Sequence, residues 1–418
     1  MTPRIQGDKE ASEGFGEPTE SSIAEAFQGS GENHFIEGGL LLCGTGCSGQ
    51  RNQQVTLESI DMERLRNELK DALGVELPQL DELREEVRKL HVQELSYRQC
   101  YAIAPVATDG GENRLTFDPI NIEIVRVADS DGVERFQKIL PLSGGADVIR
   151  DAFNPRSPNR VPLLVGFLDR LDVKYSELSY VLEAGTAGGD IRSAVRPFRD
   201  IAEWAVLLDI AWKPGKPTTL VLRDGLLRTK AIALDVMPKL KKCFEDAYRE
   251  TGSLLVGVAK RSKVLNYLSL ALHLEGTFNK KYPCFCQVPQ ELEAEAYNWA
   301  RTWMEGHAFG KMHLVKLAEH PDALVLPVDV PDWLVSRRKE LLEYLAETAK
   351  ASFPTVGYPE PLIRAHENAV LHGLEMSVFE DMMLDELFNT QSEADRDKTI
   401  EHVSLGKGLQ VGGWKEYG

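Results

Sequence analysis

Apolar residues recur along this chain in two rhythms, and the rhythm changes several times after residue 100. Residues 101–107 and 121–128 form short apolar or alternating stretches that run into Asp-Gly or Asp-Ser turns, which is typical of strands. Three later apolar runs, at 220–222, 253–260 and 323–329, have the length of buried strands. We therefore expect at least five strands between residues 100 and 330.

Helical spacing dominates the stretch before these strands, residues 57–95. Pro78 interrupts it, so we expect two helices that meet there. Their apolar stripe, about two heptads long after the proline, fits either packing on the same domain or contact with a second copy of the chain. The stripe consists of Met62, Leu65, Leu69, Leu73, Leu80, Leu83, Val87 and Leu90.

Helical spacing returns at 191–212, 231–250, 333–350 and 359–388. Pro197 lies near the start of the first of these helices, and the last opens at a proline, a residue favoured in the first turn. Strands first, then strands alternating with helices, indicate an α/β domain. Its flanks, a Gly-, Ser- and Glu-rich extension and a polar C-terminal arm, carry few apolar residues.

The charge balance restricts how such a chain can meet nucleic acid. The 418 residues carry a net charge of −17, which argues against free-standing, non-specific DNA binding. Any nucleic-acid contact must therefore be local, although most basic clusters are simply solvated surface. The clusters are residues 239–242, 260–263, 280–281 and 337–339. No apolar run approaches the ~20 residues of a membrane span, and the N-terminus lacks a secretory pattern, so we expect a cytoplasmic protein without membrane contact.

Several familiar motifs are excluded by context. Gly44–Gly49 matches the dinucleotide-binding glycine pattern, but neither a helix nor a second strand follows it as that site requires. No phosphate-binding P-loop occurs, so the chain is not expected to hydrolyse ATP itself. Six cysteines at irregular spacing indicate reduced thiols. A zinc site from Cys43, Cys47, Cys284 and Cys286 is the less favoured alternative, because the last pair is spaced poorly.

The candidate chemistry is a set of carboxylates. Asp109 and Asp224 each follow an apolar strand directly and precede a glycine, and Glu203 lies on the helix between them. Three such carboxylates can hold one or two Mg²⁺ or Mn²⁺ ions through oxygen. His366 could add a ligand or move a proton, and Tyr358 could orient a phosphate or a water. Each residue alone is more often a turn, surface or structural residue, so the prediction depends on their meeting.

These residues stand in strings that resemble the NurA family of DNA-end-processing nucleases. The resemblance covers roughly residues 100 to 375, and the last string is its most specific part. The strings are 105–111 with Asp109, 199–203 with Glu203, 220–227 with Asp224, 255–262 with Lys260, and 357–366 with Tyr358 and His366.

The resemblance implies an α/β fold with an RNase H-like core, that is, a mixed sheet flanked by helices, extended by N-terminal and C-terminal helices. It implies a homodimer, Mn²⁺-dependent (or Mg²⁺-dependent) exonuclease and endonuclease activity on DNA, and a partner, a hexameric HerA-type ATPase that translocates DNA. Asp109, Glu203, Asp224 and His366 would then be metal ligands and Tyr358 a further catalytic residue. The setting would be break repair or defence against phage.

Some assignments within this reading stay open. Asp200, Asp209 and Glu183 are alternatives to Glu203 as the middle ligand. Lys260 either extends from a strand end to solvent or contacts the scissile phosphate.

We take Lys260, Arg261 and Lys263 as candidate DNA contacts. The rival functions are an RNase H-like nuclease acting on RNA and a catalytically idle adaptor on an ATPase ring. The domains expected are a flexible extension at 1–55, a helical dimerisation or packing segment at 56–98, the nuclease domain at 99–388 and a polar tail at 389–418.

Overall fold

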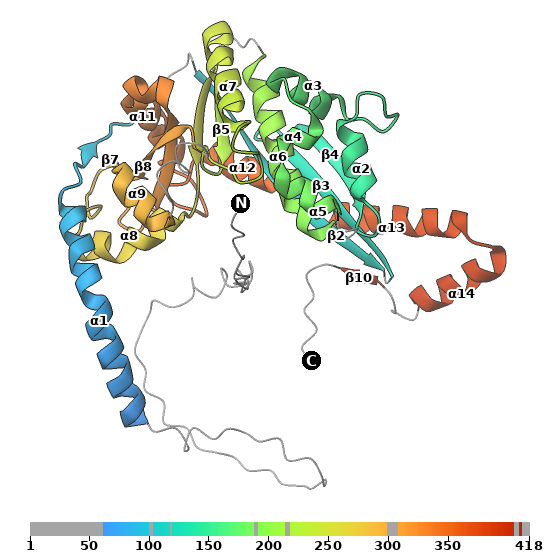
Figure 1. Cartoon of the computed structure of the whole chain (residues 1–418), viewed down its shortest axis with the longest axis horizontal. Coiled ribbons are helices and arrows are strands. Elements are labelled where there is room, and N and C mark those ends of the chain that lie inside the picture. The colour runs from blue at the N-terminus through green and yellow to red at the C-terminus, as the bar shows by residue number, and fades with distance from the viewer. Residues whose placement is uncertain are drawn as a thin grey trace, which may run out of the picture. The chain divides into compact units, whose positions relative to one another are not determined.

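A computed structural model gives the fold of the chain (Figure 1). It describes residues 62–99, 103–117, 119–187, 191–213, 218–298, 308–404 and 409–411. The chain divides into two units, Met1–Arg66 and Asn67–Gly418. The expected flexible extension, the glycine motif at 44–49 and the thiols Cys43 and Cys47 all lie outside the described residues.

The described residues form one mixed sheet with helices around it. Its strands are β1 (Gln93–Glu94), β2 (Ile103–Phe117), β3 (Ile120–Asp129), β4 (Glu134–Pro141), β5 (Thr218–Asp224), β6 (Leu254–Val258), β7 (Cys284–Gln287), β8 (Gly310–Lys316), β9 (Val325–Pro331) and β10 (Leu409–Val411). The helices before β6 are α1 (Met62–Arg88), α2 (Ala146–Phe153), α3 (Pro162–Leu171), α4 (Tyr175–Leu178), α5 (Tyr180–Ala187), α6 (Arg192–Ala211) and α7 (Met237–Thr251). Those after it are α8 (Lys263–Leu274), α9 (Gln290–Tyr297), the 3-10 helix η3 (Asp332–Arg337), α11 (Arg338–Ala349), α12 (Glu360–Ala369), α13 (Gly373–Thr390) and α14 (Glu393–Ser404).

The order of strands confirms the expected fold class. The sheet runs β1-β7-β8-β9-β6-β5-β2-β3-β4, and β10 pairs with β2 outside this path. β2, β3 and β4 are antiparallel neighbours, whereas β5 is parallel to β2 and β6 is parallel to β5. In the RNase H-like arrangement, the first strand of a three-stranded antiparallel meander pairs with a parallel strand, which in turn pairs with a second parallel strand. The order β4-β3-β2-β5-β6 has this form. β9, β8, β7 and β1 extend it with antiparallel pairs.

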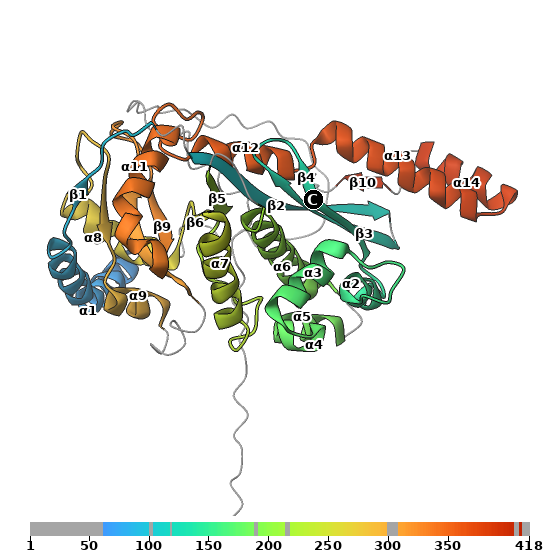
Figure 2. The ribbon, with the colours of Figure 1, turned by 90° about the horizontal axis from the view of Figure 1, so that it is seen from above.

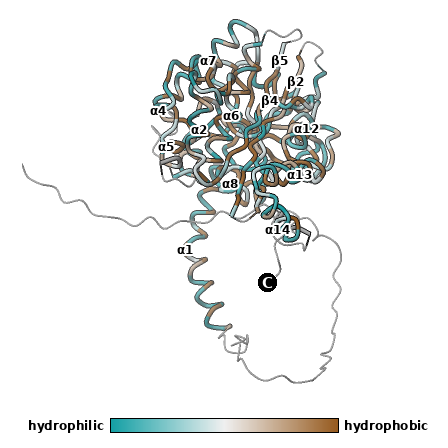
Figure 3. Tube along the Cα trace, turned by 90° about the vertical axis from the view of Figure 1, so that its right-hand side faces the viewer, coloured by the Kyte–Doolittle hydropathy of each residue, from teal (hydrophilic) through white to brown (hydrophobic). Residues whose placement is uncertain are grey.

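Helices cover the two faces of this core. Figure 2 shows α6 and α7 on one face and α12 on the other. Val221 and Leu255 pack with Trp204 of α6, while Leu222 packs with Leu362 of α12. Apolar residues gather around these central strands and α6 (Figure 3). Because side chains alternate along a strand, Asp224 shares the α12 face with Leu222, and the preceding arginine shares the α6 face with Val221.

The position of Asp109 corrects a sequence prediction. Asp109 was expected just past the end of a strand, but β2 continues through it to Phe117 because β3 pairs with β2 as far as that residue. The strand that ends there is β5, whose pairing with β2 stops at Thr108. Asp109 therefore lies at the point where β2 loses its parallel neighbour. Pro105 is tolerated in β2 because β3 pairs with β2 only from Thr108 onward.

Two helix predictions were also wrong in detail. Residues 62–88 form the single helix α1 with Pro78 inside it, in place of two helices. Its second half packs on the protein through Leu83 and Val87, whereas Leu69 and Leu73 in its first half are 64% and 56% exposed. Similarly, the stretch 359–388 is divided into α12 and α13. None of the described helices is long and apolar enough to cross a membrane.

Candidate metal centre

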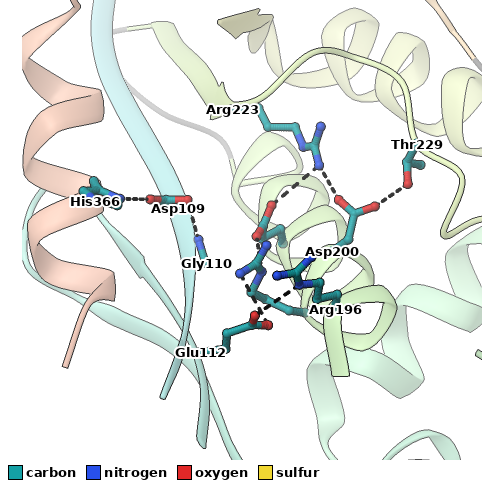
Figure 4. A network of polar contacts seen from close by, with 10 residues as sticks. Asp109, Gly110, Glu112, Arg196, Asp200, Arg223, Thr229 and His366 are labelled. Carbon is teal, nitrogen blue, oxygen red and sulfur yellow. Dashed lines mark hydrogen bonds and ion pairs between the residues drawn. The ribbon is translucent and has the colours of Figure 1, made fainter. Parts of the chain in front are cut away.

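Three residues from separate elements meet where β2 and β5 part. Asp109 of β2, Asp224 at the end of β5 and His366 of α12 each offer one ligand atom, and these atoms all lie within 4.8 Å of one another. Residues 109 and 366 are joined directly, since His366 Nδ1 is 2.6 Å from Asp109 Oδ2 (Figure 4). The convergence expected from the sequence is therefore present for these three residues.

The end of β5 fixes Asp224 in place. Gly225 follows with a φ of +137°, a conformation that L side chains rarely adopt, and its N–H donates to Val258 O at 2.7 Å. Farther along, the N–H of Leu227 donates to the buried carboxylate of Asp329 at 2.9 Å. The chain after the aspartate is thus tied to two neighbouring strands, which keeps the carboxylate at the sheet edge.

Tyr358 and Lys260 complete the surroundings of Asp224. The buried Tyr358 donates its hydroxyl to Asp224 Oδ1 at 2.8 Å. Lys260 Nζ lies 3.6 Å from Asp224 Oδ2 and 5.0 Å from the centre of the Tyr358 ring. The tyrosine therefore orients one carboxylate oxygen and the lysine faces the other.

The site has unusual proton affinities because it is partly buried and acidic. Burial, followed by the nearby charge of Asp109, raises the pKa of Asp224. The hydrogen bond to Asp109 raises the pKa of His366, since the imidazolium is favoured beside a carboxylate. Burial also raises the pKa of Tyr358, which therefore keeps its proton and acts as a donor. Strong perturbation of several adjacent groups is typical of functional sites.

Glu203 approaches the same place from the other face of the sheet. It lies on α6, and a Cβ on Gly110 would be 2.2 Å from its Oε1, so the carboxylate sits directly beneath the glycine. Its oxygens lie 3.4 Å from Arg199 and 3.6 Å from Arg223, and it is not part of the 4.8 Å cluster. Burial raises the pKa of Glu203 to about 8.

The three alternatives to Glu203 have other contacts. Asp200 is bound by Arg223 and by the Thr229 hydroxyl (Figure 4). Asp209 pairs with Lys213, and Glu183 lines a separate pocket beside α2 and α3. Glu203 is therefore the acid of this helix that reaches Gly110, which favours it as the middle ligand.

The remaining predicted residues lie beside the cluster. The exposed Arg261 lies in the turn from β6 to α8, and the exposed Lys263 is the first residue of α8; between them Ser262 caps the helix by accepting from the N–H of Leu265 at 3.0 Å. Arg199 and Arg223 were not among the site residues predicted from the sequence. Their only signals were spacing: one lies four residues before Glu203 on a helix, and the other directly precedes Asp224 on a strand.

The donors suit a hard divalent cation. Two carboxylates with an imidazole are a set that Mn²⁺ accepts, and the carboxylates alone also suit Mg²⁺. Lys260, beside one carboxylate, would balance negative charge or meet a phosphate. The fold and this donor set define an RNase H-like protein with an acidic site for a divalent metal.

Comparison with known proteins adds the family. The NurA domain profile matches residues 99–371, about two-thirds of the chain. The chain belongs to the NurA family of nucleases. No curated protein matches it.

Solved NurA structures align over most of the chain at low identity. The NurA nuclease from Sulfolobus solfataricus is 12% identical, with 79% of this chain and 99% of that chain covered and a TM-score of 0.39. A NurA structure bound to dAMP and manganese is 12% identical, with 82% and 100% covered and a TM-score of 0.35. A third, with manganese, is 10% identical, with 77% and 99% covered and a TM-score of 0.33. Membership rests on the domain match rather than on these scores.

Proposed function

We propose that this protein is a cytoplasmic Mn²⁺- or Mg²⁺-dependent deoxyribonuclease that hydrolyses phosphodiester bonds during DNA end processing. The observation that carries the proposal is the convergence of Asp109, Asp224 and His366 ligand atoms within 4.8 Å, inside a NurA domain. We include Glu203 as the fourth ligand because its carboxylate lies beneath Gly110, the residue that follows Asp109.

The side chains have separate roles in metal binding, orientation of a ligand and contact with DNA. Asp109, Asp224 and His366 hold the cation, which when bound supplies polarisation of the phosphodiester and a more acidic water. Tyr358 keeps the Asp224 carboxylate oriented through its 2.8 Å hydrogen bond. Lys260, 3.6 Å from the same carboxylate, faces the substrate phosphate, and the exposed Arg261 and Lys263 contact the DNA backbone.

The family also supports an assembly. We propose a homodimer that works with a hexameric HerA-type DNA translocase, in repair or in defence against phage. The exposed leucines of α1 that precede Pro78, Leu69, Leu73 and Leu77, favour helix-to-helix contact between two copies.

A nuclease assay tests the proposal. Wild-type protein should cleave DNA with Mn²⁺ or Mg²⁺ and lose that activity in EDTA, while matched RNA strands stay largely intact. Asp109→Ala and Asp224→Ala should each reduce cleavage to the level of the EDTA sample and leave the melting temperature close to wild type. Asp322→Ala, which removes an aspartate with an 87% exposed side chain, is the matched control. Full cleavage by both site variants would remove the site assignment.

Titration calorimetry separates the nuclease from an idle adaptor. A nuclease should bind Mn²⁺ in the wild type and lose that binding in Asp224→Ala. An adaptor would bind no Mn²⁺ at this site, and preferential cleavage of the RNA strand would instead favour the RNA-directed alternative.

A further inference from the structure

Beyond the metal centre, one edge of β2 runs for several residues without a partner among the described strands. β5 pairs with β2 from Ile103 to Thr108, and β10 pairs with it only at residues 115–117. In the part of the chain that the structure describes, no strand pairs with residues 109–114 on the side opposite β3. Among the described residues, the six residues 109–114 of β2 therefore have no strand partner on this side, over a length of about 17 Å at the usual rise of a strand.

Side chains of α6 lie along this edge of β2, on the face of the sheet that α6 covers. Gly110 and Glu112 point toward α6 because side chains alternate along the strand. Glu203 lies beneath Gly110, and one and two turns earlier on the helix Arg199 and Arg196 lie beside Glu112. Arg196 Nε is 3.5 Å from Glu112 Oε1 (Figure 4). Arg199 Nη1 is 3.5 Å from Glu112 Oε2.

The contact between these groups is weak enough to be exchanged. One carboxylate is shared by two guanidinium groups, so the three side chains carry one net positive charge. The Arg196 side chain is 71% exposed, and an exposed ion pair contributes little stability in water. Arg199 is less exposed, at 30%, and also pairs with Glu203, so it is held toward the metal centre.

We propose that Arg196 and Arg199 bind a backbone phosphate of the nucleic-acid strand next to the scissile bond, along the open edge of β2, and that Glu112 occupies them when no substrate is present. The inference rests on the proposed nuclease function. A phosphate suits the pair because guanidinium groups bind phosphate oxygens bidentately, whereas the contacts of Arg196 and Arg199 with Glu112 are 3.5 Å long. On binding, the phosphate replaces the Glu112 carboxylate at the arginines, and the exchange requires no movement of the backbone.

If a phosphate replaces Glu112 at the arginines, removing an arginine and removing the Glu112 charge should have opposite effects on DNA affinity. Arg196→Ala should weaken binding of single-stranded DNA about tenfold. It should also reduce the slope of the logarithm of the binding constant against the logarithm of the salt concentration by about one, the value for one lost phosphate contact. Glu112→Gln should strengthen binding several-fold, because the competing anion is gone while the side chain keeps its size. Arg196→Lys should retain part of the affinity, since it keeps the charge but loses the bidentate geometry.

The measurement is fluorescence anisotropy of a labelled single-stranded DNA with the full chain, in EDTA, over a series of salt concentrations. Arg249→Ala is the matched control, because Arg249 is 61% exposed and pairs with carboxylates of α7. Equal affinity for Arg196→Ala and Arg249→Ala would overturn the proposal, as would weaker binding by Glu112→Gln.

Cleavage with Mn²⁺ separates this proposal from the proposed function. If wild type cleaves DNA and Arg196→Ala cleaves with an unchanged KM, the phosphate site is wrong and the nuclease stands. If wild type cleaves nothing while Arg196→Ala still binds DNA weakly, the phosphate site stands and the proposed nuclease function falls. A rise in KM with kcat nearly unchanged supports both.

Discussion

Gly110 leaves room for the carboxylate of Glu203, the proposed fourth metal ligand. A Cβ there would lie 2.2 Å from Glu203 Oε1, the far end of a flexible side chain. Gly110→Ala should therefore fold with little loss of stability and displace the carboxylate. We expect cleavage to fall by about 10²-fold, the effect of misplacing a catalytic group by about 1 Å. The measurements are a melting curve and a single-turnover cleavage assay.

Gly111 supplies the comparison for that variant. Its Cβ would meet the backbone oxygen of Ala369 at 2.4 Å, and backbone at the end of α12 cannot move aside cheaply. Gly111→Ala should therefore lower stability by about 1–3 kcal/mol. Wild-type cleavage by Gly110→Ala would contradict a role for Glu203 at the site.

Around the metal centre, some residues could be predicted from the sequence and others could not. Asp109, Asp224, Tyr358 and His366 stand in recognisable strings, and the structure brings all four together. The contact between Arg196 and Glu112 could not be predicted from the sequence, because it depends on which face of β2 packs against α6. A one-residue change of register would have put Glu112 on the opposite face.

At the scale of the elements, β8 contains a group whose effect on stability depends on pH. His313 is fully buried, with Nδ1 2.9 Å from the carbonyl of Lys311. Burial lowers the pKa of His313 to about 4 from the ordinary 6.5. Between these values the unfolded chain binds a proton that the folded chain does not, so the free energy of unfolding falls as pH falls from 6.5 to 4.

The variant His313→Gln removes that dependence. Wild type should lose about 3 kcal/mol more stability than His313→Gln over this pH window, following the ~1.4 kcal/mol per pKa unit of such a shift. Denaturant unfolding at a series of pH values measures the difference. Parallel curves for the two proteins would show that His313 becomes protonated in the folded state.

Element boundaries were the least predictable part of the fold. Continuous apolar runs identified β5, β6 and β9 from local pattern alone, because each strand is short and buried on both faces. The end of β2 was misplaced because Asp-Gly is a common turn signal, and only pairing with the distant β3 keeps Asp109-Gly110 extended. Pro78 was taken as a helix boundary for the same kind of local reason, yet α1 continues through it.

At the scale of the whole molecule, the proposed homodimer can be tested on the exposed leucines of α1. Leu69, Leu73 and Leu77 are 64%, 56% and 51% exposed along one helix, at a spacing suited to contact with another helix. A Leu69→Ser/Leu73→Ser double variant should shift a dimer toward monomer in sedimentation-velocity measurements. Leu234→Ser, which removes a leucine that is 42% exposed on a different segment, should leave the dimer intact. Dimers of equal stability in both variants would place the dimer contact elsewhere.

The net charge of −17 bears on how DNA reaches the metal centre. Long-range repulsion between an acidic protein and DNA slows encounter, although the proposed contacts at Lys260 and Arg196 would hold a strand once it arrives. A translocase that feeds DNA into the site would overcome the encounter step without changing the chemistry.

Isolated protein should therefore cleave DNA slowly, and a HerA-type ATPase with ATP should raise the rate more than tenfold, about 1.4 kcal/mol of barrier. A partner that binds but cannot hydrolyse ATP gives the decisive comparison in a time course of cleavage. If delivery is what the nuclease lacks, that partner should leave the rate low, because docking alone moves no DNA. Equal acceleration by the active and inactive partners would mean that docking reshapes the site, and equal rates with and without any partner would mean that the acidic surface is no barrier.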